Sequence, residues 1–322
     1  MQRNWLCALA CATALFTGTA VADSYPSKPV TMVVPYPAGG ATDVVARAVA
    51  EKLTQAWGQS VIVENRAGAG TTIGASSVAR AKGDGYTLFM TTSAHTISGH
   101  LYSKLNYDPV KDFRPITLVT KVPLVLVVNP DIPVKTLPEF LAYLKENSAS
   151  VNFASPGNGT AQHLSGELFK IATQSRITHV PYRGDAPAFT DLAGGQVQMM
   201  LATITSALPL IESGKLRALA VANGKRVQAL RDVPTFAEAG MPGFEAATWF
   251  GLLAPASLPQ AQAQRIYEDV SKIVATPAMQ TRIEAMGGDV VNSTPQAFAT
   301  FMAQEQKKWG QAVKASGAVA QQ

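Results

Sequence analysis

The chain has 322 residues, of which 47% are hydrophobic and 15% are charged. This length predicts one or two domains, and the composition excludes an extensively disordered chain. The formal net charge of +5 can attract small anions, but it is too weak to indicate a nucleic-acid-binding protein.

The N-terminal segment has the features of a cleaved export signal. Arg3 supplies the positive end, an apolar core follows at Leu6 to Thr17, and Ala20-Val21-Ala22 is a small-x-small cleavage site. We predict a signal peptide over residues 1–22, cleavage after Ala22, and a periplasmic protein in a Gram-negative cell. The apolar core is too short for a stable membrane anchor. A lipoprotein processed at Cys11 is the alternative, although the apolar core before that cysteine is short.

Cysteine and histidine usage limits the chemistry of the mature chain. Both cysteines, Cys7 and Cys11, lie in the predicted signal, so disulfides, thiolate metal sites and cysteine catalysis are excluded. No H-E-x-x-H motif occurs among the four histidines. We therefore predict neither a metal site nor a cofactor.

The first predicted unit is a strand, a glycine-rich turn and a helix. The apolar run Val30 to Val34 enters Pro35 to Asp43, and a helical pattern continues over Val44 to Leu53. Gly39 and Gly40 allow a tight turn and close approach of a ligand to the backbone. The first amides of the helix lack partners and lie at its positive end, so this turn predicts an anion seat. An ordinary βα turn, with Thr42 or Asp43 as helix cap, is the alternative.

Two further units repeat this layout. Strand Ser60 to Glu64 enters the turn Arg66 to Gly74, and strand Tyr86 to Met90 enters a polar turn at Thr91 to His95. The spacing G-x-G-x-x-x-G in the second turn is close to a dinucleotide fingerprint. However, the acidic residue Glu64 precedes that turn, whereas the acidic residue of the fingerprint follows a second strand. The three units predict a parallel sheet whose turns gather at one edge, so the fold class is α/β.

A second set of αβ units follows the buried strand Leu124 to Val128. The predicted helices are Thr136 to Asn147, a helix ending near Thr173, and Ala188 to Ala193. The predicted strands are Val151 to Ala154, Ile177 to Val180, Val197 to Leu201 and Leu216 to Val221. Thr248 to Pro255 is a strand that returns to the first set, and helices at Pro259 to Val274 and from Pro295 complete the chain.

The turn Ser155 to Thr160 also joins a strand to a helix. Gly157 and Gly159 expose backbone amides, and Ser155, Asn158 and Thr160 offer side-chain donors. If this turn faces Pro35 to Asp43 across a cleft, an anion is held from both sides. Four hydrogen bonds to a charged group, at roughly 1.5–3 kcal/mol each, cover a micromolar affinity of about 8 kcal/mol before the cost of association. A pair of helix caps without a ligand is the alternative.

Catalytic signatures are absent from the sequence. No G-x-S-x-G, S-x-x-K or Walker A pattern occurs. Asp43 and Asp185 form a conceivable acid/base pair, but capping is the more ordinary role for an aspartate at a helix start. His95 and His163 lie where they can face a ligand, whereas structural roles are expected for His100 and His179.

Seven motifs in order resemble the Bug (TctC-like) family, the periplasmic solute receptors of tripartite tricarboxylate transporters. The resemblance covers essentially the whole mature chain and is highly specific because the seven motifs are in register. They are Tyr25-Pro-x-Lys-Pro-Val-Thr, Val34-Pro-Tyr-Pro-Ala-Gly-Gly, Val63-Glu-Asn-Arg-Ala-Gly-Ala-Gly, Leu105-Asn-Tyr-Asp-Pro-Val-Lys-Asp-Phe, Ser155-Pro-Gly-Asn-Gly-Thr, Val180-Pro-Tyr-Arg-Gly and Gly214-Lys-Leu-Arg-Ala-Leu-Ala-Val.

The resemblance implies a two-lobed periplasmic-binding-protein fold, type II-like, with a ligand cleft between lobes and two strand crossings at Pro123 to Asn129 and Thr248 to Ala254. We expect lobe 1 at 23–123 plus 254–322, and lobe 2 at 124–253. The implied ligand is a small carboxylate, held by amides, hydroxyls and water. The implied contacts are Tyr36, Ala38, Gly39, Gly40, Thr42, Asp43, Thr92, Ser93, Ala94, His95, Ser155, Gly157, Asn158, Gly159, Thr160, His163, Gly184, Asp185, Ala186 and Thr203.

Two departures from the family pattern bear on the ligand. Asp185 stands where relatives often have glycine, and a carboxylate there repels an anion or pairs with an amine. Ala202-Thr203 stands where relatives often carry a polar pair such as Asp-Asn. Citrate, other di- or tricarboxylates, acidic amino acids and aromatic acids all remain candidate ligands.

The expected function is that of a monomeric, non-enzymatic receptor that delivers a carboxylate to the membrane permease subunits of a tripartite tricarboxylate transporter. A receptor that reports ligand to a membrane sensor histidine kinase is the alternative from the same resemblance. A periplasmic enzyme acting on a carboxylate is the alternative from another class, and no motif supports it. Neither nucleic acid nor a membrane-embedded role is expected.

Overall fold

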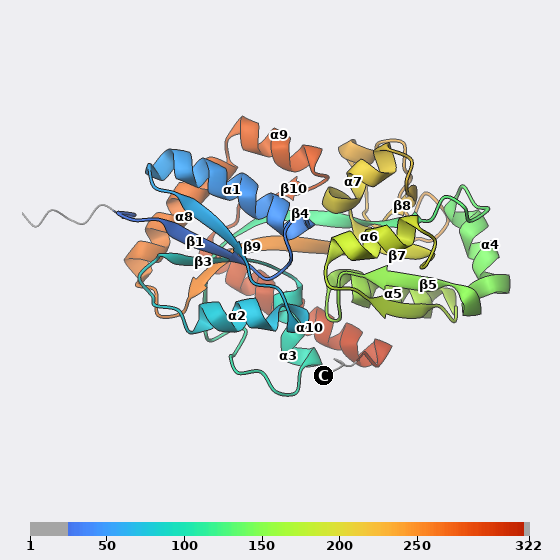
Figure 1. The fold of residues 1–322 in the computed structure, drawn as a ribbon, viewed down its shortest axis with the longest axis horizontal. Coiled ribbons are helices and arrows are strands. Elements are labelled where there is room, and N and C mark those ends of the chain that lie inside the picture. The colour runs from blue at the N-terminus through green and yellow to red at the C-terminus, as the bar shows by residue number, and fades with distance from the viewer. Residues whose placement is uncertain (1–24, 319–322) are drawn as a thin grey trace, which may run out of the picture.

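The computed structural model describes residues 25–318. Figure 1 shows an elongated molecule with an α/β half at each end of its long axis. The predicted signal peptide, its cleavage site and both cysteines lie outside the described residues. Within residues 25–318, no helix is both long and apolar enough to cross a membrane.

The first half contains the three repeated units that the sequence predicts. Its strands are parallel and its β1 strand is almost wholly buried, as expected for a sheet covered on both faces. The predicted turn Thr91 to His95 is wrong, because the strand extends to Thr92 and a helix begins at Ala94. The elements are β1 (Val30–Val34), α1 (Ala41–Trp57), β2 (Val61–Asn65), the short helix η1 (Ala69–Thr71), α2 (Thr72–Ala79), β3 (Thr87–Thr92) and α3 (Ala94–Leu101).

Two antiparallel strands, β4 (Phe113–Val128) and β9 (Ala247–Pro255), join the halves. The first part of β4, up to Pro123, pairs with β9, which also pairs with β3. The second part of β4 pairs with β7 (Met199–Thr203) and β8 (Arg217–Val221). The main strand order is therefore β2-β1-β3-β9-β4-β7-β5-β6.

The second half repeats the αβ pattern around β7. Thr136, where the sequence predicts this helix to begin, caps α4, because its hydroxyl accepts from Glu139 N at 3.3 Å. The helix α7 was not predicted, and it occupies most of the segment between the strands β7 and β8. The remaining elements are α4 (Leu137–Asn147), the short helix η2 (Ser148–Ser150), β5 (Asn152–Ser155), α5 (Ala161–Thr173), β6 (Thr178–Pro181), α6 (Asp185–Ala193) and α7 (Ile204–Glu212).

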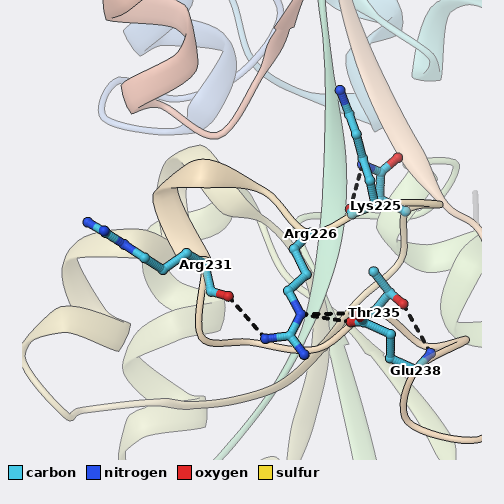
Figure 2. A network of polar contacts seen from close by, with 6 residues as sticks. Lys225, Arg226, Arg231, Thr235 and Glu238 are labelled. Carbon is cyan, nitrogen blue, oxygen red and sulfur yellow. Dashed lines mark hydrogen bonds and ion pairs between the residues drawn. The ribbon is translucent and has the colours of Figure 1, made fainter.

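A long irregular segment connects β8 to β9, with one short helix, η3 (Gln228–Leu230). Figure 2 shows its polar network, in which Arg226 Nε donates to Glu238 Oε2 at 2.9 Å and Glu238 also accepts from Thr235 N at 2.8 Å. Lys225 Nζ lies 3.7 Å from Asp289 Oδ1. This ion pair links the segment to β10 (Asp289–Val290), which pairs with β4.

The C-terminal helices return to the first half, and the last one contacts both halves (Figure 1). Ile97 of α3, Leu164 of α5 and Trp309 of α10 belong to one buried apolar cluster. The tail elements are α8 (Gln260–Val274), α9 (Pro277–Ala285) and α10 (Pro295–Ser316).

Candidate functional site

The turn between β1 and α1 is organised by Asp43 from within the first turn of the helix. Its Oδ2 accepts from Gly39 N at 3.0 Å and from Arg47 Nε at 2.8 Å. Its Oδ1 accepts from Asn65 Nδ2 at 3.0 Å. Burial favours the neutral acid, but these hydrogen bonds outweigh it and lower the pKa of Asp43 below its usual value. Asp43 is therefore an ionised support of the turn.

The start of α1 is left open by this arrangement. Gly40 is the N-cap residue and provides no side-chain cap, and Gly39 has a φ of +86°, which favours glycine. The backbone N–H of Ala41 consequently points to a partner outside α1, at the end of the helix that favours negative charge.

Two stacked histidines, His163 and His179, support the turn Ser155 to Thr160. Ser155 Oγ lies 2.7 Å from His179 Nε2, and the ring of His179 stacks on His163 with centroids 4.0 Å apart. His163 Nδ1 accepts from Gly159 N at 3.2 Å, and Thr160 Oγ1 caps α5 by accepting from His163 N. Burial lowers the pKa of His163 to about 4 and that of His179 to about 3. Both rings are therefore neutral near pH 7 and hold the shape of the turn.

The turns of the two halves touch one another. A Cβ on Gly184 would lie 3.0 Å from Pro37 Cγ, and Asp185 Oδ2 accepts from Ala41 N at 3.2 Å. A Cβ on Gly70 would lie 3.1 Å from Asn158 O. These contacts join the first half to the second, so the structure is a closed one.

A small cavity lies between the two halves. Its volume is about 20 Å³, by a measure in which one water molecule needs roughly 10–15 Å³. Six of the predicted contacts line it: Tyr36, Gly40, Thr42, Thr92, Asp185 and Thr203.

The cavity wall is rich in neutral polar groups. Tyr36 Oη and Thr92 Oγ1 are 3.1 Å apart, and Gln162 Nε2 donates to Thr203 Oγ1 at 2.7 Å. Thr248 Oγ1 lies 3.1 Å from Ser93 Oγ. Among the residues that the structure describes, no lysine or arginine lines the cavity. An anion there would consequently be held by hydroxyls and amides.

Two larger grooves flank the cavity. One, of about 580 Å³, lies against the turns that follow β1, β2, β5 and β6. The other, of about 820 Å³, lies beside α6 and α7. The predicted contacts Gly157, Asn158, Thr160 and Gly184 line the first groove, and Gly39, Ala186 and Asp185 line the second.

The remaining predicted contacts line none of these three spaces. His95 is buried in the first half, where its Nε2 lies 2.7 Å from Pro109 O and its ring meets Phe113 edge-on. Burial lowers the pKa of His95 to about 4. Like Asp43 and Ser155, it supports a turn and does not line the space beside it. The predicted contacts that line none of the three spaces are Ala38, Asp43, Ser93, Ala94, His95, Ser155, Gly159 and His163.

Six cavity-lining residues were not among the predicted contacts: Pro37, Ala41, Pro156, Gln162, Thr248 and Phe250. Pro37, Ala41 and Pro156 lie inside the turns already singled out. Gln162 lies in the first turn of α5. A polar side chain directly after the glycine-rich turn was an available sequence signal for a ligand contact. Thr248 and Phe250 come from β9, and sequence spacing alone does not bring that strand to the turns.

A metal site has no support in this geometry. In the part of the chain that the structure describes, no group of three or more His, Asp or Glu side chains is arranged to hold an ion.

Comparison with known proteins identifies close relatives along nearly the whole chain. Residues 45–318 match the model of the tripartite tricarboxylate transporter family receptor, TctC. Protein BugT of Bordetella pertussis is 37% identical over 309 residues, which cover 95% of each chain.

Solved structures of related proteins have the same fold. The periplasmic binding protein BugD is 37% identical, with a TM-score of 0.87 over 92% of this chain and 100% of that one. Rpa4515 of R. palustris with adipate is 34% identical, with a TM-score of 0.89 over 92% and 99% of the chains. MatC of Rhodopseudomonas palustris with bound malate is 34% identical, with a TM-score of 0.84 over 90% and 100%.

Proposed function

The chain belongs to the TctC family of tripartite tricarboxylate transporter receptors, which are non-enzymatic binding proteins, and we propose that it captures a small carboxylate between its two halves. The bound acid is then delivered to the membrane permease subunits of such a transporter. The observation that carries this proposal is the cavity lined from both halves by neutral hydrogen-bond donors.

The chemistry of the cavity suits a carboxylate. Hydroxyls of Thr42, Thr92 and Thr203 line it, and α1 begins at its edge. Hydrogen bonds from neutral donors to a charged group are worth roughly 1.5–3 kcal/mol each, so four or five are sufficient for micromolar binding. Solved structures of relatives with adipate and with malate support the same ligand class, which we extend to di- and tricarboxylates, acidic amino acids and aromatic acids.

Binding requires the halves to separate. A cavity of about 20 Å³ holds little more than a water molecule. We propose that the halves move as lobes, 23–123 plus 254–322 and 124–253, about the segments of β4 and β9 that join them. Closure on the ligand follows the hinge motion of other two-domain binding proteins, and the receptor acts as a monomer in the periplasm.

Titration calorimetry of the mature chain tests this proposal. The protein is unfolded, freed of bound molecules and refolded, and is then titrated with succinate, malate, adipate, citrate, aspartate, glutamate and benzoate. We expect one class to bind at micromolar concentration, and to raise the free energy of unfolding by about 2.7 kcal/mol at 100 times its dissociation constant. No product should form from the bound acid over hours.

A pair of threonine variants provides the control. Thr203→Val removes the acceptor of the Gln162 amide in the cavity wall, and we expect about ten-fold weaker binding. Thr300→Val changes an exposed threonine on α10 that lines neither the cavity nor the flanking grooves, and should leave the affinity unchanged. Absence of binding to every acid, or equal effects of the two variants, would contradict the proposal.

A further inference from the structure

Asp185 is the only charged residue that lines the closed cavity in the described part of the chain. It is the first residue of α6 in the second half. Its Oδ2 reaches the first half, where it accepts from Ala41 N at 3.2 Å. The protein's own carboxylate therefore occupies the helix start at which the sequence predicts the carboxylate of a ligand.

The other oxygen of this carboxylate is unsatisfied. Asp185 Oδ1 is buried without a hydrogen-bond partner. The hydroxyl of nearby Ser206 donates to Thr203 O at 3.2 Å, and its proximity to the Asp185 carboxyl only partly opposes the effect of burial on the pKa of that group. Although Asp185 is partly exposed as a residue, burial of its carboxyl group raises its pKa. A buried carboxylate without a cation is unfavourable. A ligand that donates a hydrogen bond to Oδ1 would supply the missing partner.

When the two halves close, the Asp185 carboxylate is brought next to the cavity in which a ligand would be bound. Asp185 moves with the second half, and Gly184 before it packs against Pro37 when the halves meet. A ligand held in the cavity therefore lies beside the carboxylate. A second carboxylate at this position would be repelled, whereas a protonated nitrogen would be attracted and would donate to Oδ1.

The rest of the cavity wall has different chemistry. Thr92, Thr248 and Gln162 line it with hydroxyl and amide groups, which suit the carboxylate of a ligand. The cavity wall consequently combines one charged acceptor with several neutral hydroxyl and amide groups.

We propose that Asp185 is a specificity-determining residue that selects amino carboxylates, ligands with a protonated amine beside their carboxylate. The amine pairs with Asp185, and the carboxylate is bound by the hydroxyls and amides. This inference rests on the proposed function and narrows its ligand class.

Matched ligand pairs test the inference. Each pair consists of an amino acid and the same acid without its amine: aspartate and succinate, glutamate and glutarate, 2-aminoadipate and adipate, and phenylalanine and 3-phenylpropionate. Affinities are measured by titration calorimetry on the refolded, ligand-free mature chain. For the tightest-binding pair, we expect the amino member to bind at least about ten-fold more tightly.

Variants of two aspartates on α6 assign this preference to Asp185. Asp185→Asn keeps the shape but removes the charge, and should reduce the preference by about ten-fold or more. Asp191→Asn removes a charge from the same helix outside the cavity, and its remaining carbonyl oxygen can accept from Tyr182 Oη as Asp191 does. That variant should leave the preference unchanged. Asp185→Ser replaces Asp185→Asn if the latter does not fold.

The outcomes separate the two proposals. Tighter binding of the acid without the amine supports a carboxylate receptor but overturns the role of Asp185. An unchanged preference in Asp185→Asn also overturns it. If no member of any pair binds but malate, citrate or benzoate does, the inference fails and the carboxylate receptor stands. If none of these acids binds, both fail.

Discussion

Asp43 and Asp185 both lie at the start of a helix, but their surroundings give them different roles. Asp43 accepts hydrogen bonds from Gly39, Arg47 and Asn65, so its charge is satisfied within the first half. Asp185 has one backbone donor from the other half and one oxygen without a partner. Sequence position does not distinguish the two, because their partners come from distant segments.

The buried histidines make the stability of the fold sensitive to acid. Burial lowers the pKa of His95 and of His163 to about 4, and that of His179 to about 3. In the unfolded chain each ring protonates at about 6.5. Below that pH, the unfolded state therefore binds more protons than the native state, and the free energy of unfolding decreases as the pH falls.

We predict that this free energy decreases continuously from about pH 6.5 to about pH 4. Denaturant unfolding at a series of pH values measures the slope. His179→Gln should reduce the slope because one of the three buried rings is removed. His100→Gln, which changes an exposed histidine, should leave it unchanged. A free energy of unfolding that is constant between about pH 6.5 and about pH 4 would contradict the prediction that the three buried histidine rings stay neutral in the native state.

At the scale of elements, the repeated strand–turn–helix units were predictable and several later elements were not. β1, β2 and β3 are short apolar runs followed by turn residues, so their pattern in the sequence is clear. The Phe113 to Pro123 part of β4 was missed. It contains Pro115 and Pro123, and its pairing with β9 is interrupted by two irregularities in register. Here tertiary pairing outweighs local propensity.

The helix α10 also has a role that its sequence pattern does not reveal. Its Trp309 is buried in an apolar cluster with side chains of α3 from the first half and α5 from the second. Trp309 Nε1 donates to Glu305 Oε2 at 2.7 Å, and Trp249 Nε1 of β9 donates to the same oxygen at 3.1 Å. The last helix therefore stabilises the contact between the halves on the side of α3 and α5.

We predict that Trp309→Ala lowers the free energy of unfolding by about 3–5 kcal/mol, because a large buried ring is removed from a packed cluster. Equilibrium denaturation in urea measures this loss. Trp309→Phe retains most of the ring but not the hydrogen bond to Glu305, so its loss should be smaller. Equal losses would mean that the hydrogen bond, and not packing, dominates.

At the scale of the whole molecule, the family resemblance predicted the two-lobed α/β fold, and the structure has it. The division into lobes at residues 123/124 and 253/254 stays a prediction. The cavity is harder to predict because it exists only where the halves meet. Turn residues such as Tyr36 and Thr92 could be anticipated from their places after strands, whereas Phe250 comes to the cavity on a joining strand.

Closure itself depends on close contact between turns of the two halves. Gly184 has a φ of +107°, and a Cβ at this position would lie 3.0 Å from Pro37 Cγ and 3.1 Å from Pro37 Cδ. These separations are shorter than ordinary carbon–carbon contacts of roughly 3.5–4.0 Å. A side chain at residue 184 would consequently hold the halves apart while leaving each half able to fold.

We predict that Gly184→Val weakens ligand binding by about ten-fold or more, because the closed state loses its contact between the turns. In solution X-ray scattering with ligand present, the Gly184→Val variant should have a larger radius of gyration than the unchanged chain. Gly240→Val is the matched control, since Gly240 also has a positive φ, +91°, but a Cβ on Gly240 would have no neighbouring atom within 4 Å. It carries a similar backbone strain without a contact between the halves, so it should reduce stability without changing closure. Equal losses of affinity in the two variants would show that strain at a glycine, and not the Pro37 contact, is responsible.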